Sequence, residues 1–139
     1  MDLNILLFLT PKKDVACLFD YFTIRQALEK MEYHRYSSMP IITEDGDYVG
    51  TLTEGDLLYY IKNECDLNFE EAEDTALSKV RRYRDCEAIR VDASLSDVFE
   101  KAMNQNFIPV LDDRGKFIGI ITRKKILTYF KRKIDALEN

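Results

Sequence analysis

The strongest constraint on this chain is an internal duplication. Residues 37–61 read SSMPIITEDGDYVGTLTEGDLLYYI, and residues 108–130 read IPVLDDRGKFIGIITRKKILTYF, the same plan about 69 residues later. Prolines, glycines and threonines coincide in the two copies: Pro40 with Pro109, Gly46 with Gly115, Gly50 with Gly119, and Thr53 with Thr122. Chance does not readily align so many residues of special backbone geometry, so the chain contains two copies of one structural unit.

Each copy carries the pattern of a helix, a β-hairpin and a second helix. In the first copy, strand-like residues 39–43 and 48–52 flank an Asp-Gly turn, which tolerates the positive φ of a tight reversal. Upstream of each hairpin, apolar residues recur at i, i+3, i+4 and i+7 behind Thr23 or Ser94, which predicts a capped helix with one buried face. These apolar positions are Ile24, Ala27, Leu28 and Met31 in the first copy and Leu95, Val98, Phe99 and Ala102 in the second. With short strands predicted at residues 15–19 and 88–91, each copy reads strand–helix–strand–strand–helix.

These patterns predict one α+β domain made of two repeats. Each repeat alone would leave an apolar sheet face uncovered, and pairing the repeats about a pseudo-twofold axis would bury both faces. We place the repeats at residues 9–62 and 88–134, with a cleft where they meet. The connector, residues 63–87, is first acidic and then basic, but it carries enough apolar residues to pack as a partly helical segment. Residues 131–139 are expected to extend the last helix, with Ile134 and Leu137 continuing an apolar stripe.

Composition argues against several classes of protein. The net charge of −5 argues against a general nucleic-acid-binding surface. No apolar run approaches the roughly 20 residues of a membrane span, and the early LNILLFL is expected to be a packing segment. The three cysteines are widely spaced with no CxxC pair, so we expect reduced thiols in a cytoplasmic protein.

Catalysis has little support in the sequence. A single histidine, His34, offers no specific nucleophile–base arrangement, and it is expected to face water. The acidic residues of the connector lack the spacing of a metal-binding loop, and neither copy has a Gly-rich phosphate loop. We therefore expect no enzyme activity, no catalytic residue and no metal site.

The duplicated pattern resembles the CBS (cystathionine-β-synthase) domain pair, also called the Bateman module. The resemblance covers nearly the whole chain and rests on Ala27-Leu28 with Met31, on MPII and IPVLD at the hairpins, and on GTLTEGD at residues 50–56. The last of these matches the family's glycine–hydrophobic–Thr/Ser–Asp element in full. In the second copy, GIITRKK at residues 119–125 places Lys125 where the family has an acid. The whole also resembles small stand-alone bacterial CBS proteins that bind adenine nucleotides, some of them cyclic di-AMP.

The resemblance implies two ligand clefts between the repeats. Each would combine the Thr-x-x-Asp element of one repeat with the first strand and pre-hairpin segment of the other. The first cleft would be lined by Thr53, Asp56, Ile89, Arg90, Val91, Phe107, Ile108 and Pro109. The second would be lined by Thr122, Arg123, Lys124, Val15, Ala16, Tyr36, Ser37, Met39 and Pro40.

Elementary chemistry favours the second cleft. Three consecutive cations at a helix N-terminus are unfavourable with the helix dipole unless an anion lies nearby, so a phosphate-rich ligand suits this cleft. Tyr36 is expected to stack on the adenine, and backbone amides near Ala16 to read its edge. In the first cleft, Asp56 is expected to accept from ribose hydroxyls and Thr53 to bind phosphate.

Structural alternatives stay open for both motifs. Thr53 and Asp56 also form the pattern of a helix capping box, which does not exclude ligand binding, and residues 123–125 also fit a solvated basic face. As functions, we weigh a sensor of AMP, ADP, ATP or cyclic di-AMP that signals to an unidentified partner protein against a ligand-free dimerisation module. S-adenosylmethionine or NADH is a third ligand class. The resemblance also implies a homodimer, since CBS domain pairs usually associate through their helices, here through exposed apolar positions of the repeat helices.

Overall fold

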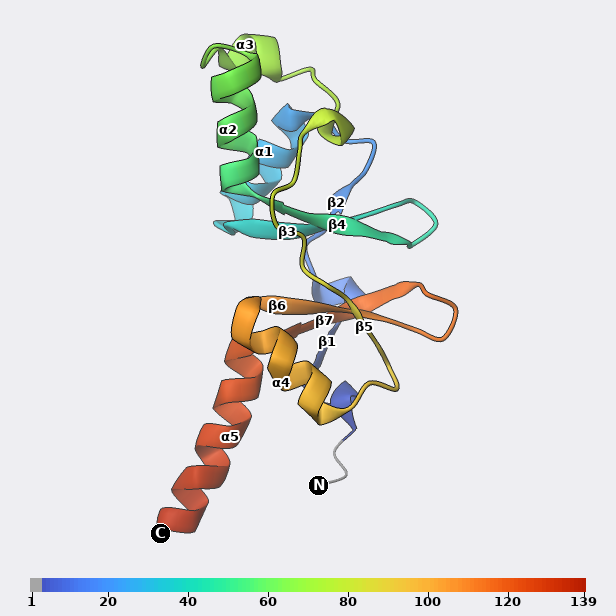
Figure 1. Cartoon of the computed structure of the whole chain (residues 1–139), viewed down its shortest axis with the longest axis vertical. Helices are drawn as coiled ribbons and strands as arrows, with labels where there is room; N and C mark the ends of the chain where they lie inside the picture. The colour runs from blue at the N-terminus through green and yellow to red at the C-terminus, as the bar shows by residue number, and fades with distance from the viewer. Residues whose placement is uncertain (1–3) are drawn as a thin grey trace. The chain divides into compact units, whose positions relative to one another are not determined.

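The computed structural model describes residues 4–139, which form two compact units (Figure 1). We call Ala16–Asp85 the repeat-1 unit; the repeat-2 unit joins Cys86–Asn139 to the described residues up to Val15. The elements of the repeat-1 unit are β2 (Leu18–Phe19), α1 (Ile24–His34), β3 (Ser38–Ile42), β4 (Tyr48–Thr53), α2 (Glu54–Glu64), α3 (Phe69–Ala72) and the 3₁₀ helix η3 (Leu77–Lys79). Those of the repeat-2 unit are η1 (Ile5–Phe8), β1 (Leu9–Pro11), η2 (Lys12–Asp14), β5 (Ile89–Arg90), α4 (Leu95–Asn104), β6 (Phe107–Leu111), β7 (Phe117–Thr122) and α5 (Arg123–Glu138).

The two repeats share one topology. In the repeat-1 unit β2 pairs parallel with β3, and β3 pairs antiparallel with β4; β5, β6 and β7 repeat this arrangement. The hairpin register even shifts at equivalent places, after Ile41 and after Val110. The predicted order strand–helix–strand–strand–helix is therefore confirmed in both copies. The pseudo-twofold packing of the repeats stays a prediction.

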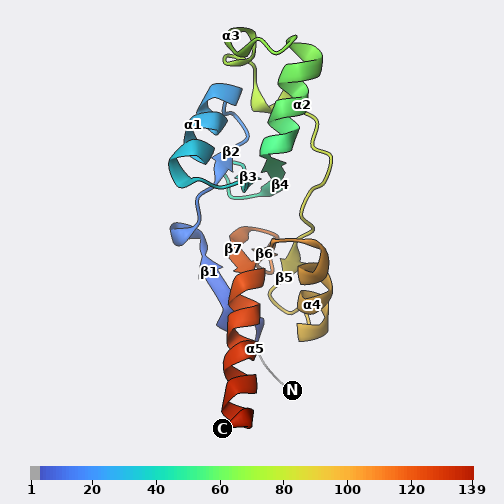
Figure 2. The ribbon, with the colours of Figure 1, turned by 90° about the vertical axis from the view of Figure 1, so that its left-hand side faces the viewer.

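The helices of each unit lie on one side of its sheet (Figures 1 and 2). Each unit has its own hydrophobic core. In α1 and α4 the first helical turn is closed by a capping box, made by Thr23 with Gln26 and by Ser94 with Asp97, which confirms both predicted caps. The predicted apolar faces are buried at Ile24, Ala27, Met31, Val98 and Ala102. Leu28 and Leu95 are only partly buried, and Phe99 is exposed at the helix surface.

The segment that precedes each repeat packs on the sheet of the other repeat. Strand β1 pairs antiparallel with β7, and Ile5 and Phe8 lie in the core of the repeat-2 unit, which confirms the predicted packing role of this segment; Leu3 lies outside the described residues. The connector, which precedes repeat 2, contacts β4 of the repeat-1 unit, where the Asp85 carboxylate accepts the Thr51 N–H at 3.0 Å. Gly119 lies where β1 crosses, and a Cβ there would stand 2.2 Å from the carbonyl oxygen of Thr10.

The connector is an integral part of the repeat-1 unit. It contains α3 and η3, as the predicted partly helical segment requires, and it buries Ala72, Leu77 and Val80 in the core. Its backbone carbonyls at Thr75 and Glu73 accept the N–H groups of Ile24 and Arg25 at the start of α1. These bonds satisfy helix amides that otherwise lack a partner within the helix. Within residues 4–139, no helix combines the length and apolar character that crossing a membrane requires.

Candidate functional site

Thr53 and Asp56 meet at the start of α2 in a complete capping box. The Thr53 hydroxyl accepts the Asp56 N–H at 3.1 Å, and the Asp56 Oδ2 accepts the Thr53 N–H at 3.0 Å. The local sequence dictates this geometry, since β4 ends at Thr53 in extended conformation and an oxygen at each position satisfies a free amide. The capping role of this pair is therefore confirmed.

Asp56 has a further partner that the motif does not disclose. Its Oδ1 accepts the backbone N–H of Tyr83 in the connector at 3.2 Å, and the residue is only 3% exposed. Both carboxylate oxygens are thus engaged by backbone amides. Pattern reasoning missed Tyr83, because nothing in its own spacing indicates that the connector folds back onto α2.

The second motif is more open and more basic. The Thr122 hydroxyl accepts the Lys125 N–H at 3.1 Å, but Lys125 supplies no acceptor for the returning bond of a capping box. The Arg123 Nε donates to the Ala102 carbonyl at 2.7 Å, and the Lys125 Nζ donates to the Leu9 carbonyl at 3.4 Å. Lys124 is exposed, and its side chain makes no hydrogen bond or ion pair within residues 4–139. Of the three cations, Lys124 is the one whose side chain makes no hydrogen bond within residues 4–139, so it is fully available to an external anion.

In each repeat the pre-hairpin segment lies against its own motif. The Ser37 carbonyl accepts the Glu54 N–H at 2.9 Å, and the Asn106 carbonyl accepts the Arg123 N–H at 2.9 Å. The two bonds are equivalent in the two copies. The backbone of the pre-hairpin segment therefore reaches the first turn of the motif helix in both repeats.

Tyr36 and Ser37 line a pocket of about 500 Å³ in the repeat-1 unit. Its other lining residues come from α1 and its C-cap Arg35, from Phe69 of α3 and from Glu54 of α2. The Tyr36 ring stacks on His34 with centroids 5.4 Å apart, and about half of Tyr36 is exposed. His34 is thus half-buried against an aromatic neighbour instead of facing water fully, because the ring of Tyr36 covers one of its faces.

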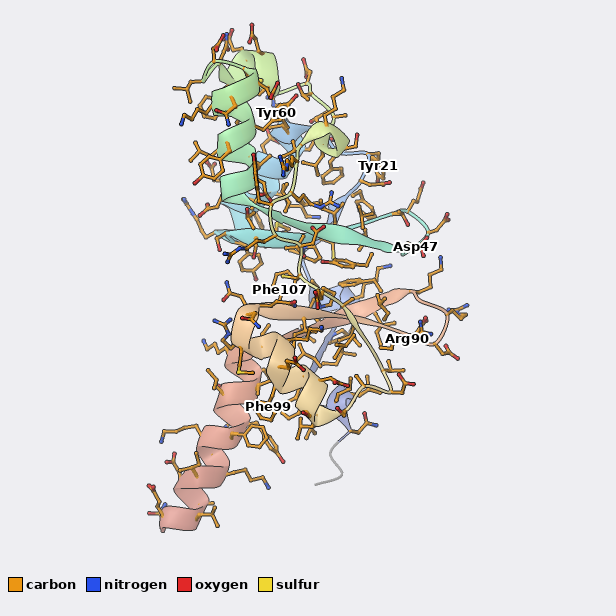
Figure 3. The ribbon with its side chains drawn as sticks, viewed as in Figure 1. Tyr21, Asp47, Tyr60, Arg90, Phe99 and Phe107 are labelled. Atoms are coloured by element: carbon orange, nitrogen blue, oxygen red, sulfur yellow. The ribbon has the colours of Figure 1, made fainter. Side chains whose placement is uncertain are left out.

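The remaining predicted site residues differ in accessibility. Met39 and Ile108 are fully buried in the cores of their units, and Ile89, Phe107, Pro40 and Pro109 are also buried. Val15, Ala16 and Val91 are half-buried. The Arg90 guanidinium donates to the Asp113 carbonyl at 2.6 Å, which holds it against the β6–β7 turn (Figure 3). Each predicted cleft draws on both units, so the assembly of either cleft remains a prediction.

The chemistry of the described residues offers no metal centre. Within residues 4–139, no group of three or more His, Cys, Asp or Glu side chains is arranged to hold a metal ion. None of the three cysteines is joined in a disulfide, and burial raises the pKa of the Cys65 thiol, which disfavours the reactive thiolate.

Comparisons with known structures reproduce the fold over nearly the whole chain. A crystal structure of CbpB in complex with c-di-AMP matches with a TM-score of 0.86 and 28% identity, covering 98% of this chain and 89% of that one. A CBS domain protein from Streptococcus pneumoniae TIGR4 matches with a TM-score of 0.81 and 32% identity, covering 92% of this chain and 86% of that one. CbpB from Streptococcus agalactiae matches with a TM-score of 0.80 and 29% identity, covering 92% and 80%.

Two curated relatives come from archaea of other genera. An uncharacterised 17.7 kDa protein of Acidianus ambivalens is 26% identical over 72% of this chain, and an uncharacterised protein of Methanocaldococcus jannaschii is 20% identical over 94%. The chain spans 57% and 50% of the length of these two relatives.

The family model for the CBS domain matches twice, at residues 7–63 and 80–132. These two segments carry both copies of the duplicated pattern, including the capped motifs at Thr53 and Thr122. The chain belongs to the CBS domain family, with two CBS repeats.

Proposed function

We propose that this protein is a regulatory module that binds an adenine nucleotide between its two CBS repeats and signals occupancy to a partner protein. The observation that carries the proposal is the start of α5, where exposed Lys124 follows the N-cap Thr122 with no partner within residues 4–139. A helix N-terminus with an uncommitted cation attracts phosphate. CbpB, 28% identical over 98% of this chain, was crystallised with c-di-AMP, which supports an adenine nucleotide as the ligand class.

The two proposed clefts differ in their readiness for a ligand. In the first, Asp56 is buried and already accepts two backbone N–H groups. In the second, Thr122 caps a helix whose third residue is a lysine, so positive charge surrounds the amide end of the helix. We therefore assign the principal nucleotide site to the second cleft, with Tyr36 as the adenine platform.

The test is a thermal-shift panel with AMP, ATP, cyclic di-AMP and S-adenosylmethionine. A ligand at a hundredfold its Kd stabilises by about 2.7 kcal/mol, which raises Tm by several degrees for a domain of this size. Lys124→Ala is expected to weaken binding about tenfold or more through loss of a charge-assisted contact. Arg132→Ala, an exposed cation farther along the same helix, serves as the matched control and is expected to bind like the wild type.

Two results would overturn the proposal or its placement. No shift with any ligand favours a ligand-free interaction module. A shift that survives Lys124→Ala and disappears in Arg90→Ala moves the site to the first cleft, provided that the unliganded Tm of each variant is subtracted.

We also propose a homodimer, because α5 exposes an apolar stripe. Leu127, Phe130, Ile134 and Leu137 recur at spacings of three and four residues, and Leu127 and Leu137 are 60% and 87% exposed. A shallow hollow of about 520 Å³ lies over Leu127, Phe130 and Ile134. Apolar residues gathered on one helix face favour contact with another protein surface, and a second copy of the chain supplies the same stripe.

A further inference from the structure

A separate pocket of about 360 Å³ lies wholly within the repeat-1 unit, between α2 and the connector. Helix α2 contributes Tyr59, Tyr60, Asn63 and Glu64, and Tyr60 is seen on α2 in Figure 3. The opposite wall consists of Lys79, Arg81 and Tyr83. The pocket shares only Asp56 with the proposed inter-repeat clefts, so its ligand would be an additional one.

Hydrogen bonds hold the connector wall in place. Tyr83 donates its N–H to the buried Asp56 carboxylate, and two residues later the Asp85 carboxylate accepts the Thr51 N–H of β4. Arg82 pairs with Asp85 at 2.7 Å and donates to the Val49 carbonyl at 3.5 Å. The pocket wall is therefore fixed to the edge of the sheet before any ligand arrives, which lowers the entropic cost of binding.

The polar groups of this pocket suit an anion attached to a planar ring. The Arg81 guanidinium lies 5.0 Å from the Tyr83 ring centroid, and that ring meets Tyr59 edge-on at 6.1 Å. Lys79 and Arg81 are exposed, and neither forms an ion pair in the part of the chain that the structure describes. Two unpaired cations beside aromatic rings attract a phosphate or carboxylate, while Asn63 and Glu64 across the pocket accept hydroxyl or amino hydrogens.

We infer that this pocket binds a mononucleotide, with its phosphate at Lys79 and Arg81 and its base against the tyrosine rings. The volume is near the lower end of the range for small-molecule sites, which suits a mononucleotide better than a cyclic dinucleotide. The adenine class of this ligand rests on the proposed function; the location of the pocket and its anion preference do not. A nucleotide here ties α2 to the connector, whose end at Asp85 leads directly into the repeat-2 unit.

The test is isothermal titration calorimetry with AMP, adenosine and inorganic phosphate. The wild type is expected to bind two AMP molecules, and the double variant Lys79→Ala, Arg81→Ala is expected to bind one. Lys124→Ala is expected to lose the other. Adenosine and phosphate alone are each expected to bind the pocket at least tenfold more weakly than AMP, because each lacks half of the contacts. Lys62→Ala, an exposed lysine of α2 outside the pocket, is the matched control and should retain both sites.

A photoaffinity experiment maps the site without any substitution. Irradiation with 8-azido-AMP is expected to label Tyr59, Tyr60 or the connector peptide around Tyr83, in competition with AMP. One AMP bound per chain, lost in Lys124→Ala and unchanged in the double variant, overturns the pocket and leaves the proposed function standing. Cyclic di-AMP binding that depends on Lys124, without any AMP binding, also overturns the pocket and leaves the proposed function standing. Absence of binding by every nucleotide overturns both.

Discussion

Gly119 of β7 lies where β1, from the start of the chain, pairs with the sheet of the repeat-2 unit. At Gly119 the φ is +153° and the Thr10 carbonyl is close behind, so a methyl group there must displace β1. We expect Gly119→Ala to destabilise the protein by about 1–3 kcal/mol, the range for overpacking. A methyl group added at Gly55, inside α2, would meet no heavy atom closer than 3.7 Å, and Gly55→Ala should instead stabilise by roughly 0.5–1 kcal/mol. Thermal denaturation of the two variants checks the opposite signs; equal effects would contradict the crossing of β1.

Asp112 shapes the β6–β7 turn through its charge. Its carboxylate accepts the N–H groups of Lys116 and Arg114, both at 2.9 Å, and these bonds hold the pKa of Asp112 below its usual value. A carboxyl whose pKa is lowered in the folded state stabilises the fold above its unfolded pKa of about 3.9, and loses that effect as the pH falls through the folded pKa. Asp112→Ala is therefore expected to lower Tm by a few degrees at pH 7, with a gap from wild type that closes below about pH 4.

The neighbouring Asp113 provides the control for this pH dependence. It is exposed and takes part in the turn only through its backbone carbonyl, so Asp113→Ala should follow the wild-type pH profile. A constant gap between Asp112→Ala and wild type from about pH 7 to about pH 3 would show that charge is not responsible.

The 3₁₀ helix η1 lies near the start of the chain but packs in the core of the repeat-2 unit. Phe8 is fully buried, with its ring 5.2 Å from Tyr129 and 6.4 Å from Phe130 of α5. Phe8→Ala is expected to cost about 3–5 kcal/mol, and Leu7→Ala, at an exposed neighbouring position, less than about 0.5 kcal/mol. Hydrogen exchange should show the loss of protection in β6, β7 and α5; a loss confined to η1 and β1 would contradict this packing.

Local patterns predicted most elements of both repeats because each has a local physical cause. The caps at Thr23, Ser94 and Thr53, the Asp-Gly turn of the first hairpin and the helical stripes are decided by residues within a few positions of one another. The contact between Tyr83 and Asp56 spans 27 positions and uses a backbone N–H, so no side-chain pattern encodes it. The same limit applies to β1, whose partner β7 is specified by tertiary packing. The capped motif at Thr53 was therefore within reach of sequence patterns, and the connector contact at Asp56 was not.

For the whole molecule, the exposed stripe of α5 decides the expected oligomeric state. A double variant, Leu127→Glu and Ile134→Glu, is expected to elute from gel filtration at half the wild-type mass, because buried charges oppose association. Its circular dichroism should be unchanged, since both side chains are exposed in the monomer. Arg132→Glu alters charge on the same helix outside the stripe and should remain a dimer. A wild type that elutes as a monomer at micromolar concentration would contradict the proposed dimer.

The segment with η1 and β1 precedes repeat 1 in the chain but completes the repeat-2 unit, and this matters when the chain is cut between the two repeats. A nick between Asp85 and Cys86 leaves a first fragment that still carries η1 and β1, the pieces that complete the sheet and core of the second fragment. Strand addition of this kind is a recognised mode of association between separate chains. Fragments 1–85 and 86–139, produced separately and mixed, are therefore expected to complement each other and form a stable complex. The same property makes the bond between Asp85 and Cys86 a natural place to split the protein into a two-part reporter.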